Sequence, residues 1–519
     1  MSDSLSRIIA IVRADFLVRF RRPSTLIIFL LLSAFAYLWV PAPMSGRALM
    51  QIDGHRALYN SGAVGMATAS IAMVFVGLFG FYVVSNAVRR DVVSRCGVIA
   101  ASTPMRSSEY LLGKLFGNIT FLATFTAGFM VTSMLMLLLR AEAPFQPLVF
   151  IEQYLFLTPG AIVFASAVAV LFESIRWLSG KLGDVIYFFL WSAAIGVVVS
   201  QEAGKGGITW GRYLDFTGFG FMISQTQRTL GVESISIGSA PVDPALTPIV
   251  FPGLSLTSGS LVPRIVSSLL PIVLLPIATL FFHRFDPVRT GRTSDKGKRN
   301  WLGRIQMLFK PLSRRAVGLL MRPARGISFA NAVWADALLT LTLFPLAFVA
   351  IIGAAVFALI IKPADSLPII FAALAIVISD VSTREVRAAT TANLYAAPRL
   401  RENFVWWKFA SAFVIALLMC VVPVLRGGLH SLGTLLNGIF FIVASATALG
   451  IVSRTAKTFI VVFLSFWYLV VNDHGASPLL DFAGFYGSGT SATILLYSTC
   501  GVLALIVAQI YHRTRLNRA

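Results

Sequence analysis

The chain has 519 residues, of which 57% are hydrophobic and 13% charged, and its mean hydropathy of +0.81 excludes an ordinary soluble protein. Its net charge of +21 would suit nucleic-acid binding in a soluble protein, but in a membrane protein such charge sets the orientation in the bilayer. Three distant cysteines, Cys96, Cys420 and Cys500, form neither a disulfide framework nor a metal motif. We therefore expect a multi-pass membrane protein that binds neither nucleic acid nor metal.

The basic N-terminal segment has a polar region too long for a secretory signal and no cleavage site, so we expect it to be retained. A stripe at helical spacing follows, made of Leu5, Ile8, Ile9, Val12 and Phe16. It predicts an amphipathic helix lying in the inner membrane surface, in contact with lipids. A similar stripe lies within 301–315, with arginine and lysine between its apolar residues.

Twelve apolar segments are candidates for membrane-spanning helices, because only a helix satisfies its own backbone groups in lipid. They are 24–40, 62–88, 115–139, 148–175, 185–200 and 262–282, then 337–361, 367–381, 409–425, 432–452, 458–472 and 491–511. With both termini in the cytoplasm, most of the 43 lysines and arginines fall on the cytoplasmic side. The predicted fold is all-α, with one six-span half in 1–282, a basic linker with an amphipathic helix in 283–326, and a second six-span half in 327–519.

The two halves share landmarks in the same order. VRADFL at 12–17 recurs as VWADAL at 333–338, just before the first span of each half. After the second span, Arg90-Asp91 recurs as Arg384-Glu385, followed 14 residues later by a proline and 10 residues after that by a lysine. Because each half has an even number of spans, the halves have the same orientation, so we expect two parallel repeats.

The polar loops 89–114 and 384–408 occupy equivalent places on the cytoplasmic side. Arg90-Asp91, Thr103-Pro104 and the run YLLGK at 110–114 follow a second span, each half has six spans, and a long outer loop precedes the sixth span. This arrangement resembles the type-2 family of ABC (ATP-binding-cassette) transporter permeases, here as two tandem copies in one chain. The second loop lacks the threonine before Pro398 and the glycine before Lys408.

The resemblance implies that these loops contact two copies of a cytoplasmic ATP-binding-cassette ATPase subunit. The implied contact residues are Arg90, Asp91, Pro104, Arg106, Glu109, Tyr110 and Lys114 in the first loop, and Arg384, Glu385, Pro398, Arg401, Phe404 and Lys408 in the second. The chain contains no G-x-x-x-x-G-K-[ST] motif, so ATP and Mg²⁺ are expected on the partner and no cofactor on this chain. The alternative for each loop is an ordinary positively charged membrane anchor.

Residues within the spans give little sign of chemistry. Asp15, Glu173, Arg264, Asp336 and Asp380 stand at predicted span ends, where contact with water is expected, and this argues against ion-coupled transport. No histidine or serine has the partners of a catalytic site or a metal site, so we expect no enzyme activity in this chain.

Aromatic residues of the second and fifth spans are candidates for a substrate path, because the resemblance implies that these spans line it. They are Phe75, Phe79, Phe81, Trp191, Phe371, Phe463 and Trp467, and ordinary helix packing explains them equally well. The outer loop 201–261 is turn-rich, and its segment FGFMISQTQRTLG predicts a short helix at the membrane interface that resembles the re-entrant cap of the family.

Together these features predict a permease of the prokaryotic inner (plasma) membrane. We expect it to export a hydrophobic or amphiphilic compound, with energy from separate ATPase subunits. Two alternatives remain open: an ion-coupled secondary transporter, and a membrane scaffold for an associated enzyme. The sequence does not identify the substrate.

Overall fold

The computed structural model describes residues 2–282, Phe285 and residues 328–516, apart from short gaps such as 204–210 and parts of 22–46. The chain divides into two compact units, Met1–Thr293 (unit 1) and Ser294–Ala519 (unit 2). Apart from Phe285, the predicted linker 283–326 and its amphipathic stripe lie outside the described residues.

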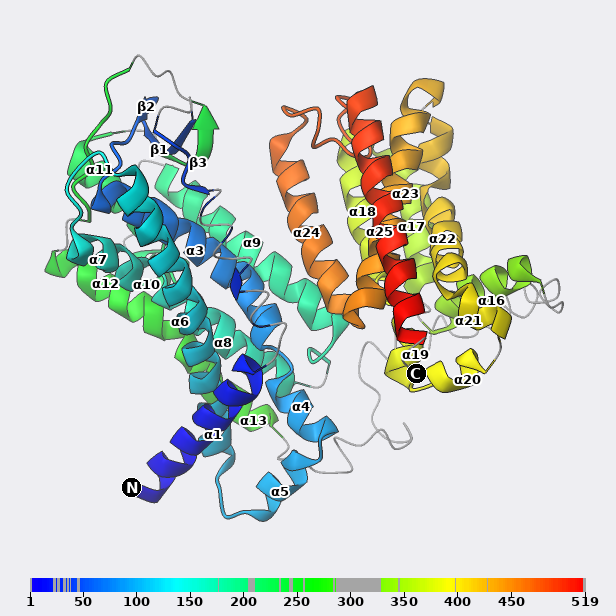
Figure 1. Cartoon of the computed structure of the whole chain (residues 1–519), viewed down its shortest axis with the longest axis horizontal. Helices are drawn as coiled ribbons and strands as arrows, with labels where there is room; N and C mark the ends of the chain where they lie inside the picture. Colours follow the sequence, from blue (N-terminus) through cyan, green and yellow to red (C-terminus); the bar gives the residue numbers. More distant parts are fainter. Residues whose placement is uncertain are drawn as a thin grey trace. The chain divides into compact units, whose positions relative to one another are not determined.

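Unit 1 contains long helices with a small sheet at one end and short helices at the other (Figure 1). Its elements are α1 (Ser2–Phe20), β1 (Arg47–Ile52), β2 (His55–Arg56), α3 (Ser61–Val84), α4 (Ala87–Val93), α5 (Cys96–Ser102), α6 (Ser107–Arg140), α7 (Pro147–Leu157), α8 (Pro159–Ser174), α9 (Lys181–Ala203), α10 (Gly211–Leu214), α11 (Phe219–Leu230), β3 (Ile235–Pro241), α12 (Ser258–Leu269), the 3₁₀ turn η1 (Leu270–Val273) and α13 (Leu274–Phe281). Helix α3 packs against α6, α7 and α8 and forms the centre of the unit.

In the described part of unit 2, all the regular secondary structure is helical. Its elements are α16 (Phe329–Leu343), α17 (Leu346–Ile360), α18 (Pro363–Ile378), α19 (Arg384–Ala388), α20 (Thr391–Tyr395), α21 (Pro398–Glu402), α22 (Phe404–Arg426), α23 (Gly428–Ser453), α24 (Ala456–Asp473) and α25 (Ser491–Leu516). Helix α23 packs against α22, α24 and α25. The short helices α19, α20 and α21 lie near the C-terminal end of α25 (Figure 1).

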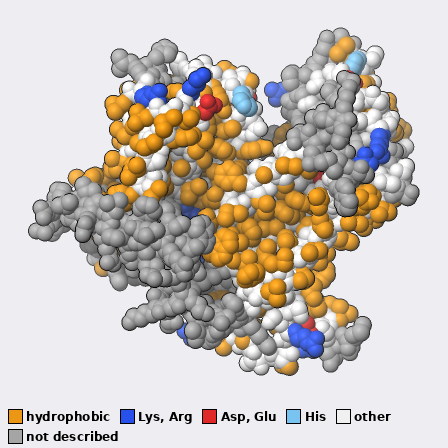
Figure 2. All heavy atoms as spheres, turned by 180° about the vertical axis from the view of Figure 1, so that it is seen from behind, with side chains coloured by type: hydrophobic (Ala, Val, Ile, Leu, Met, Phe, Trp, Pro, Cys, Tyr) orange, Lys and Arg blue, Asp and Glu red, His pale blue; other side chains and the backbone are white. Residues whose placement is uncertain are grey.

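Nine helices in the described part of the chain are long and apolar enough to cross a membrane, and the bent pair α16 and α17 would make a tenth. The nine coincide with nine of the predicted spans, and the bent pair coincides with 337–361. Segment 367–381 corresponds to the shorter apolar helix α18, and 24–40 lies largely outside the described residues. Broad areas of hydrophobic side chains are visible on the surface of the described residues, with few charged side chains among them (Figure 2). The chain is therefore a mainly helical, multi-pass membrane protein, and the twelve-span layout stays a prediction.

One small sheet departs from the expected all-α fold. Strand β1 lies between β2 and β3 and is antiparallel to both, with Ile52 opposite His55 on one side and Ile235 on the other. The turn between β1 and β2 uses Asp53 and Gly54, both with positive φ. Strand β3 comes from the long loop before α12, and its pairing with β1 joins segments too far apart for local periodicity to reveal. In the same loop, the predicted helix is confirmed as α11.

Candidate functional site: two buried charge clusters

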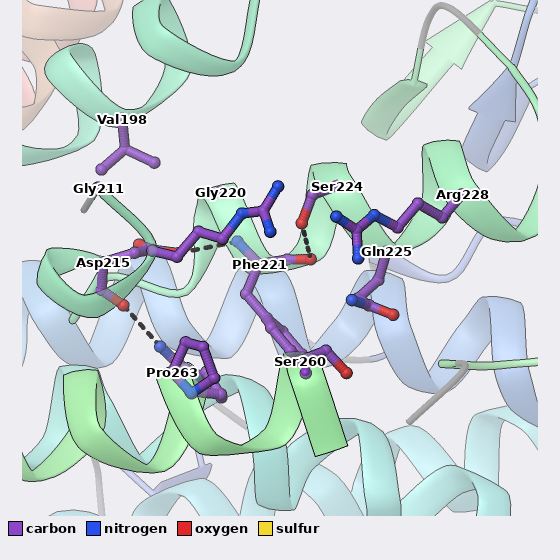
Figure 3. Close-up of a pocket in the computed structure, with 13 residues that line it drawn as sticks. Val198, Gly211, Asp215, Gly220, Phe221, Ser224, Gln225, Arg228, Ser260 and Pro263 are labelled. Atoms are coloured by element: carbon purple, nitrogen blue, oxygen red, sulfur yellow. Dashed lines mark hydrogen bonds between the residues drawn. The ribbon is translucent and has the colours of Figure 1, made fainter. Parts of the chain in front are cut away.

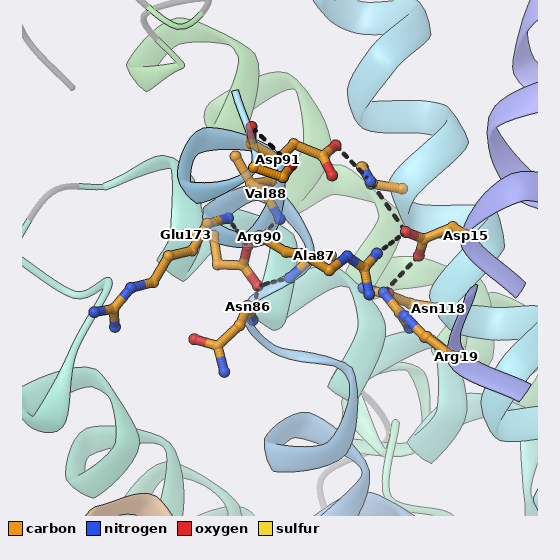
Figure 4. A network of polar contacts seen from close by, with 12 residues as sticks. Asp15, Arg19, Asn86, Ala87, Val88, Arg90, Asp91, Asn118 and Glu173 are labelled. Carbon is orange, nitrogen blue, oxygen red and sulfur yellow. Dashed lines mark hydrogen bonds and ion pairs between the residues drawn. The ribbon is translucent and has the colours of Figure 1, made fainter. Parts of the chain in front are cut away.

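A buried charge cluster joins three elements of unit 1, and we call it cluster 1 (Figure 4). Its centre is Asp15 of α1, which is 4% exposed. The ammonium of Lys114, in α6, lies 3.1 Å from the Asp15 carboxylate and 2.8 Å from that of Asp91, in α4. Arg90 of α4 also pairs with Asp15. Helix α1, the start of α6 and the polar loop after α3 are thus held together by ions.

Cluster 1 contains a third cation, Arg19, one helical turn after Asp15. Its guanidinium lies 2.6 Å from the Asp15 carboxylate and donates a hydrogen bond of 2.7 Å to the side-chain oxygen of Asn118. Burial alone would raise the pKa of Asp15, but the positive charges of Arg19, Lys114 and Arg90 outweigh it, so the pKa lies below its ordinary value. Asp15 is therefore ionised at neutral pH.

Unit 2 contains a corresponding cluster, which we call cluster 2. Lys408 of α22 lies 3.0 Å from the carboxylate of Asp336, in α16, and also pairs with Glu385, in α19. Arg384 of α19 lies 3.7 Å from Asp336. The side chain of Lys408 is fully buried, and Asp336 is 5% exposed. Cluster 2 therefore joins α16, at the start of the first apolar segment of unit 2, to the polar loop and to the start of α22.

The four charged positions common to both clusters are those that the sequence spacing matches. Asp15 and Asp336 occupy the same place in VRADFL and VWADAL, and the pair Arg90-Asp91 corresponds to Arg384-Glu385. Lys114 and Lys408 each bridge the two carboxylates of their cluster. The spacing of these residues in the sequence does not indicate that the aspartate and the lysine of each half pair with one another.

The clusters differ at two neighbouring positions. Thr340 stands four residues after Asp336, where unit 1 has Arg19, and its hydroxyl accepts a hydrogen bond of 2.8 Å from Arg384. Ser411 donates a hydrogen bond of 2.6 Å to the Asp336 carboxylate, whereas unit 1 has Gly117 three residues after its lysine. Cluster 1 therefore has three cations and two carboxylates, and cluster 2 has two of each.

An aromatic ring lies beside the lysine of each cluster. The Lys114 ammonium lies 5.4 Å from the centre of the Tyr110 ring, whose hydroxyl donates a hydrogen bond of 2.7 Å to Asp91. The Lys408 ammonium lies 5.9 Å from the Phe404 ring. Each ring covers a buried cation and contributes a cation–π contact.

The polar loop of unit 1 has a second anchor in Glu173, at the end of α8. Its carboxylate accepts hydrogen bonds from four successive backbone amides at the start of α4, those of residues 86–89 (Figure 4). Unit 2 has a different contact there, because Gly450 near the end of α23 lies directly against Ser382. A Cβ atom on Gly450 would lie 2.1 Å from the Ser382 hydroxyl oxygen.

The other predicted loop residues are not all brought together. Pro104 and Arg106 are exposed, and Glu109 contacts α1, where Ser4 donates a 2.6 Å hydrogen bond to its carboxylate. Between the two anchors the loop presents α5, where Val98 and Ile99 are 58% and 68% exposed.

In unit 2, Arg401 is exposed and lies outside cluster 2. Its backbone oxygen lies 2.7 Å from Nε2 of His512. Pro398 begins α21, and its side chain lies outside the described residues.

The predicted substrate-path residues fall into two groups. The four that are buried within their own unit are Phe81, Trp191, Phe371 and Phe463. The three that are partly exposed are Phe75, Phe79 and Trp467. Trp191 packs so closely on α3 that a Cβ atom at Gly77 would lie 2.1 Å from its ring. The buried four contribute to helix packing, and the substrate path stays a prediction.

The expectation that charged residues at span ends contact water is wrong for three of the five. Asp15, Asp336 and Arg264 are between 2% and 5% exposed, while Glu173 and Asp380 are partly exposed. In α1, Leu5 and Ile9 of the predicted apolar stripe are 60% and 56% exposed, which leaves them accessible to lipids, and the interfacial position of the helix stays a prediction. Hydropathy did not predict the burial of these charged residues, because it averages along the chain and does not locate polar partners on other elements.

Arg264 supports the junction of α7 and α8 in unit 1, and it lines a pocket together with Asp215 and Phe221 (Figure 3). Pro159 cannot donate a backbone hydrogen bond, and α7 ends just before it. The Arg264 guanidinium donates to the backbone oxygens of Phe156, Leu157 and Asp215, the last two at 2.8 and 2.7 Å. The Asp215 carboxylate accepts from the amides of Gly218 and Phe221, both at 2.8 Å, and so fixes the start of α11.

A comparison of the chain with models of known families, with characterised proteins and with solved structures found no match. Within the described residues, no group of three or more histidine, cysteine, aspartate or glutamate side chains is arranged to hold a metal ion. The charge clusters are thus the principal polar features to which a function can be tied.

Proposed function

We propose that the chain is the membrane permease of an ATP-driven transporter, in which separate ATPase subunits act on the two polar loops. The observation that carries this proposal is the matched pair of charge clusters. In each unit, ions connect the polar loop to the start of a long apolar helix, α6 in unit 1 and α22 in unit 2. A force applied to either loop would therefore be transmitted directly to a helix.

The same match supports an internal repeat of two six-span halves with the same orientation. The clusters share the order of their elements, four charged positions and the ring beside the lysine. Two equivalent loops on one side suit two copies of one soluble partner. The resemblance to type-2 permeases implies that this partner is a cytoplasmic ATP-binding-cassette subunit, and that the substrate is hydrophobic or amphiphilic.

The exposed side chains of α5 give the sharpest test. Replacing Val98 and Ile99 with serine should reduce the amount of ATPase that co-purifies with the full chain from native membranes, and should lower substrate-stimulated ATP hydrolysis. The matched control replaces Leu5 and Ile9, which are similarly exposed on α1 and outside the loop. Loss of the ATPase in both variants, or in neither, contradicts the proposed role of α5.

Reconstitution separates this proposal from the two alternatives. The purified chain in vesicles should transport only when the ATPase and ATP are added. Accumulation of a solute by the chain alone, driven by a proton or sodium gradient, would establish an ion-coupled carrier instead. A scaffold would show no transport under either condition.

A further inference from the structure

A pocket in unit 2, which we call the arginine pocket, opens beside cluster 2. Its polar lining includes Tyr395, Arg454, Tyr511, His512 and Arg515. The cavity volume is about 50 Å³, several times the roughly 10–15 Å³ that a cavity needs on this measure to hold one water molecule. The pocket lies where α25 ends, with the end of α23 and the short helix α20 around it.

The arginine pocket is positively charged. Arg454 and Arg515 are both exposed, and neither forms an ion pair with a carboxylate among the described residues. No acidic side chain lines the pocket, and nearby Glu385 is paired with Lys408. Burial raises the pKa of Tyr395, the charges of Arg515 and Arg454 oppose this increase, and the charge of Glu385 reinforces it, so the phenol stays protonated and can donate a hydrogen bond. The pocket thus favours an anion.

The corresponding place in unit 1 is filled by two phenyl rings. Phe282 stacks on Tyr110 at 5.5 Å, as the His512 ring stacks on Phe404 at 5.2 Å. Three residues after Phe282 comes Phe285, whose ring lies so close to Gly97 that a Cβ atom there would be 2.4 Å away.

Three residues after His512 comes Arg515, so this cation takes the place of the second phenyl ring. Unit 2 therefore has an open, cationic pocket where unit 1 has a closed aromatic contact.

A row of side chains leads from the arginine pocket along α25. Leu503, Val507, Tyr511 and Arg515 follow one another at four-residue intervals and so lie on one side of the helix. Leu503 and Val507 are 55% and 54% exposed, so unit 2 leaves this apolar stretch uncovered. A ligand with an anionic head in the pocket can lay an apolar tail on these residues.

We propose that the arginine pocket binds the phosphate group of an anionic membrane lipid. Arg454 and Arg515 bind the phosphate oxygens, the Tyr395 hydroxyl donates a further hydrogen bond, and an acyl chain lies along Leu503 and Val507. Guanidinium groups suit phosphate because their N–H donors match its oxygens. A free phosphate ion offers the same head group, but it gains nothing from the apolar row. The site does not depend on an ATPase or on transport.

Native mass spectrometry of the full chain in detergent tests the site, with phosphatidylglycerol and phosphatidylcholine as probes. The wild type should retain one phosphatidylglycerol in preference to phosphatidylcholine. Retention should weaken about tenfold for each of R454Q and R515Q, because a hydrogen bond to a charged group contributes roughly this factor. R513Q removes the same charge from the same helix end, but Arg513 does not line the pocket, so this variant should bind like the wild type.

A second variant guards against loss of folding. R515F copies Phe285 of unit 1 and should fill the pocket, so it should abolish retention while eluting from a sizing column like the wild type. Equal retention of the two lipids by the wild type, or equal weakening by R513Q and R515Q, overturns the proposal. Inorganic phosphate at millimolar concentration distinguishes the sources. If phosphate alone protects the delipidated protein against heat and phosphatidylglycerol does not, the lipid assignment is wrong.

Discussion

Replacing Lys408 with methionine should destabilise unit 2 more than replacing Lys114 destabilises unit 1. Lys408 is completely buried and is the cation that pairs with Glu385 within the described residues. Its removal leaves Glu385, 7% exposed, without a partner, while Asp336 retains Arg384 and Ser411. Removing one partner of a buried ion pair costs about 3–5 kcal/mol.

The loss in unit 1 should be smaller, because the same change there leaves other partners in place. Without Lys114, Asp15 still pairs with Arg19 and Arg90. Asp91 has 20% of its side chain exposed, so water can replace part of the lost interaction. We expect a cost of about 1–2 kcal/mol, the range for a lost hydrogen bond to a partly solvated charge.

The assay heats the full chain in detergent to a series of temperatures and then measures, by sizing chromatography, the fraction that still elutes as folded protein. With about 2–4 °C per kcal/mol for a unit of this size, K408M should lower the apparent Tm by about 6–20 °C and K114M by about 2–8 °C. The double variant K408M/E385Q should regain more than half of the loss, because no unpaired carboxylate remains. Equal shifts for K408M and K114M, or no recovery in the double variant, would refute the reasoning.

Three further predictions concern unit 1. The cations keep the pKa of Asp15 below its ordinary value despite burial, so its contribution to stability is present above about pH 3.9 and is lost as the pH falls through the folded-state pKa. The Tm difference between the wild type and D15N should therefore stay constant from about pH 7 to pH 5 and become smaller below about pH 4. A difference that becomes smaller as the pH rises would contradict this prediction. G77A should lower the free energy of unfolding by about 1–3 kcal/mol, because the added Cβ would lie 2.1 Å from the Trp191 ring. The control G196A, whose added Cβ would have no neighbour within 4 Å, should leave the Tm nearly unchanged in the same assay. In a variant with Cys420 and Cys500 replaced by serine, the exposed Cys96 should react with a membrane-impermeant maleimide in inside-out vesicles and not in right-side-out vesicles. The reverse labelling pattern would show that the chain has the opposite orientation in the membrane.

Hydropathy and the repeated spacing predicted most of the long helices and part of the candidate site. Long apolar runs require helices in a bilayer, so nine predicted spans coincide with nine helices of the structure. The matched loops also singled out Arg90, Lys114, Arg384 and Lys408, because a residue that keeps its place in two copies of a pattern is constrained by more than local structure.

The sequence did not predict which distant segments pair with one another. Asp15 and Asp336 stand next to apolar segments at predicted span ends, so contact with water was expected, yet their partners come from α4, α6, α19 and α22. The sheet of β1 and β3 joins distant segments in the same way. The arginine pocket is likewise formed by residues that are distant in the sequence, such as Tyr395, Arg454 and Arg515.

The junction of α7 and α8 has a consequence for the order in which the protein is made. Its open carbonyls at Phe156 and Leu157 are satisfied by Arg264, which the ribosome adds only after α9, α11 and β3. Until then, the Arg264 guanidinium is not available to those oxygens, so we expect water or the insertion machinery to satisfy them. Completion of this junction during biosynthesis therefore waits for α12.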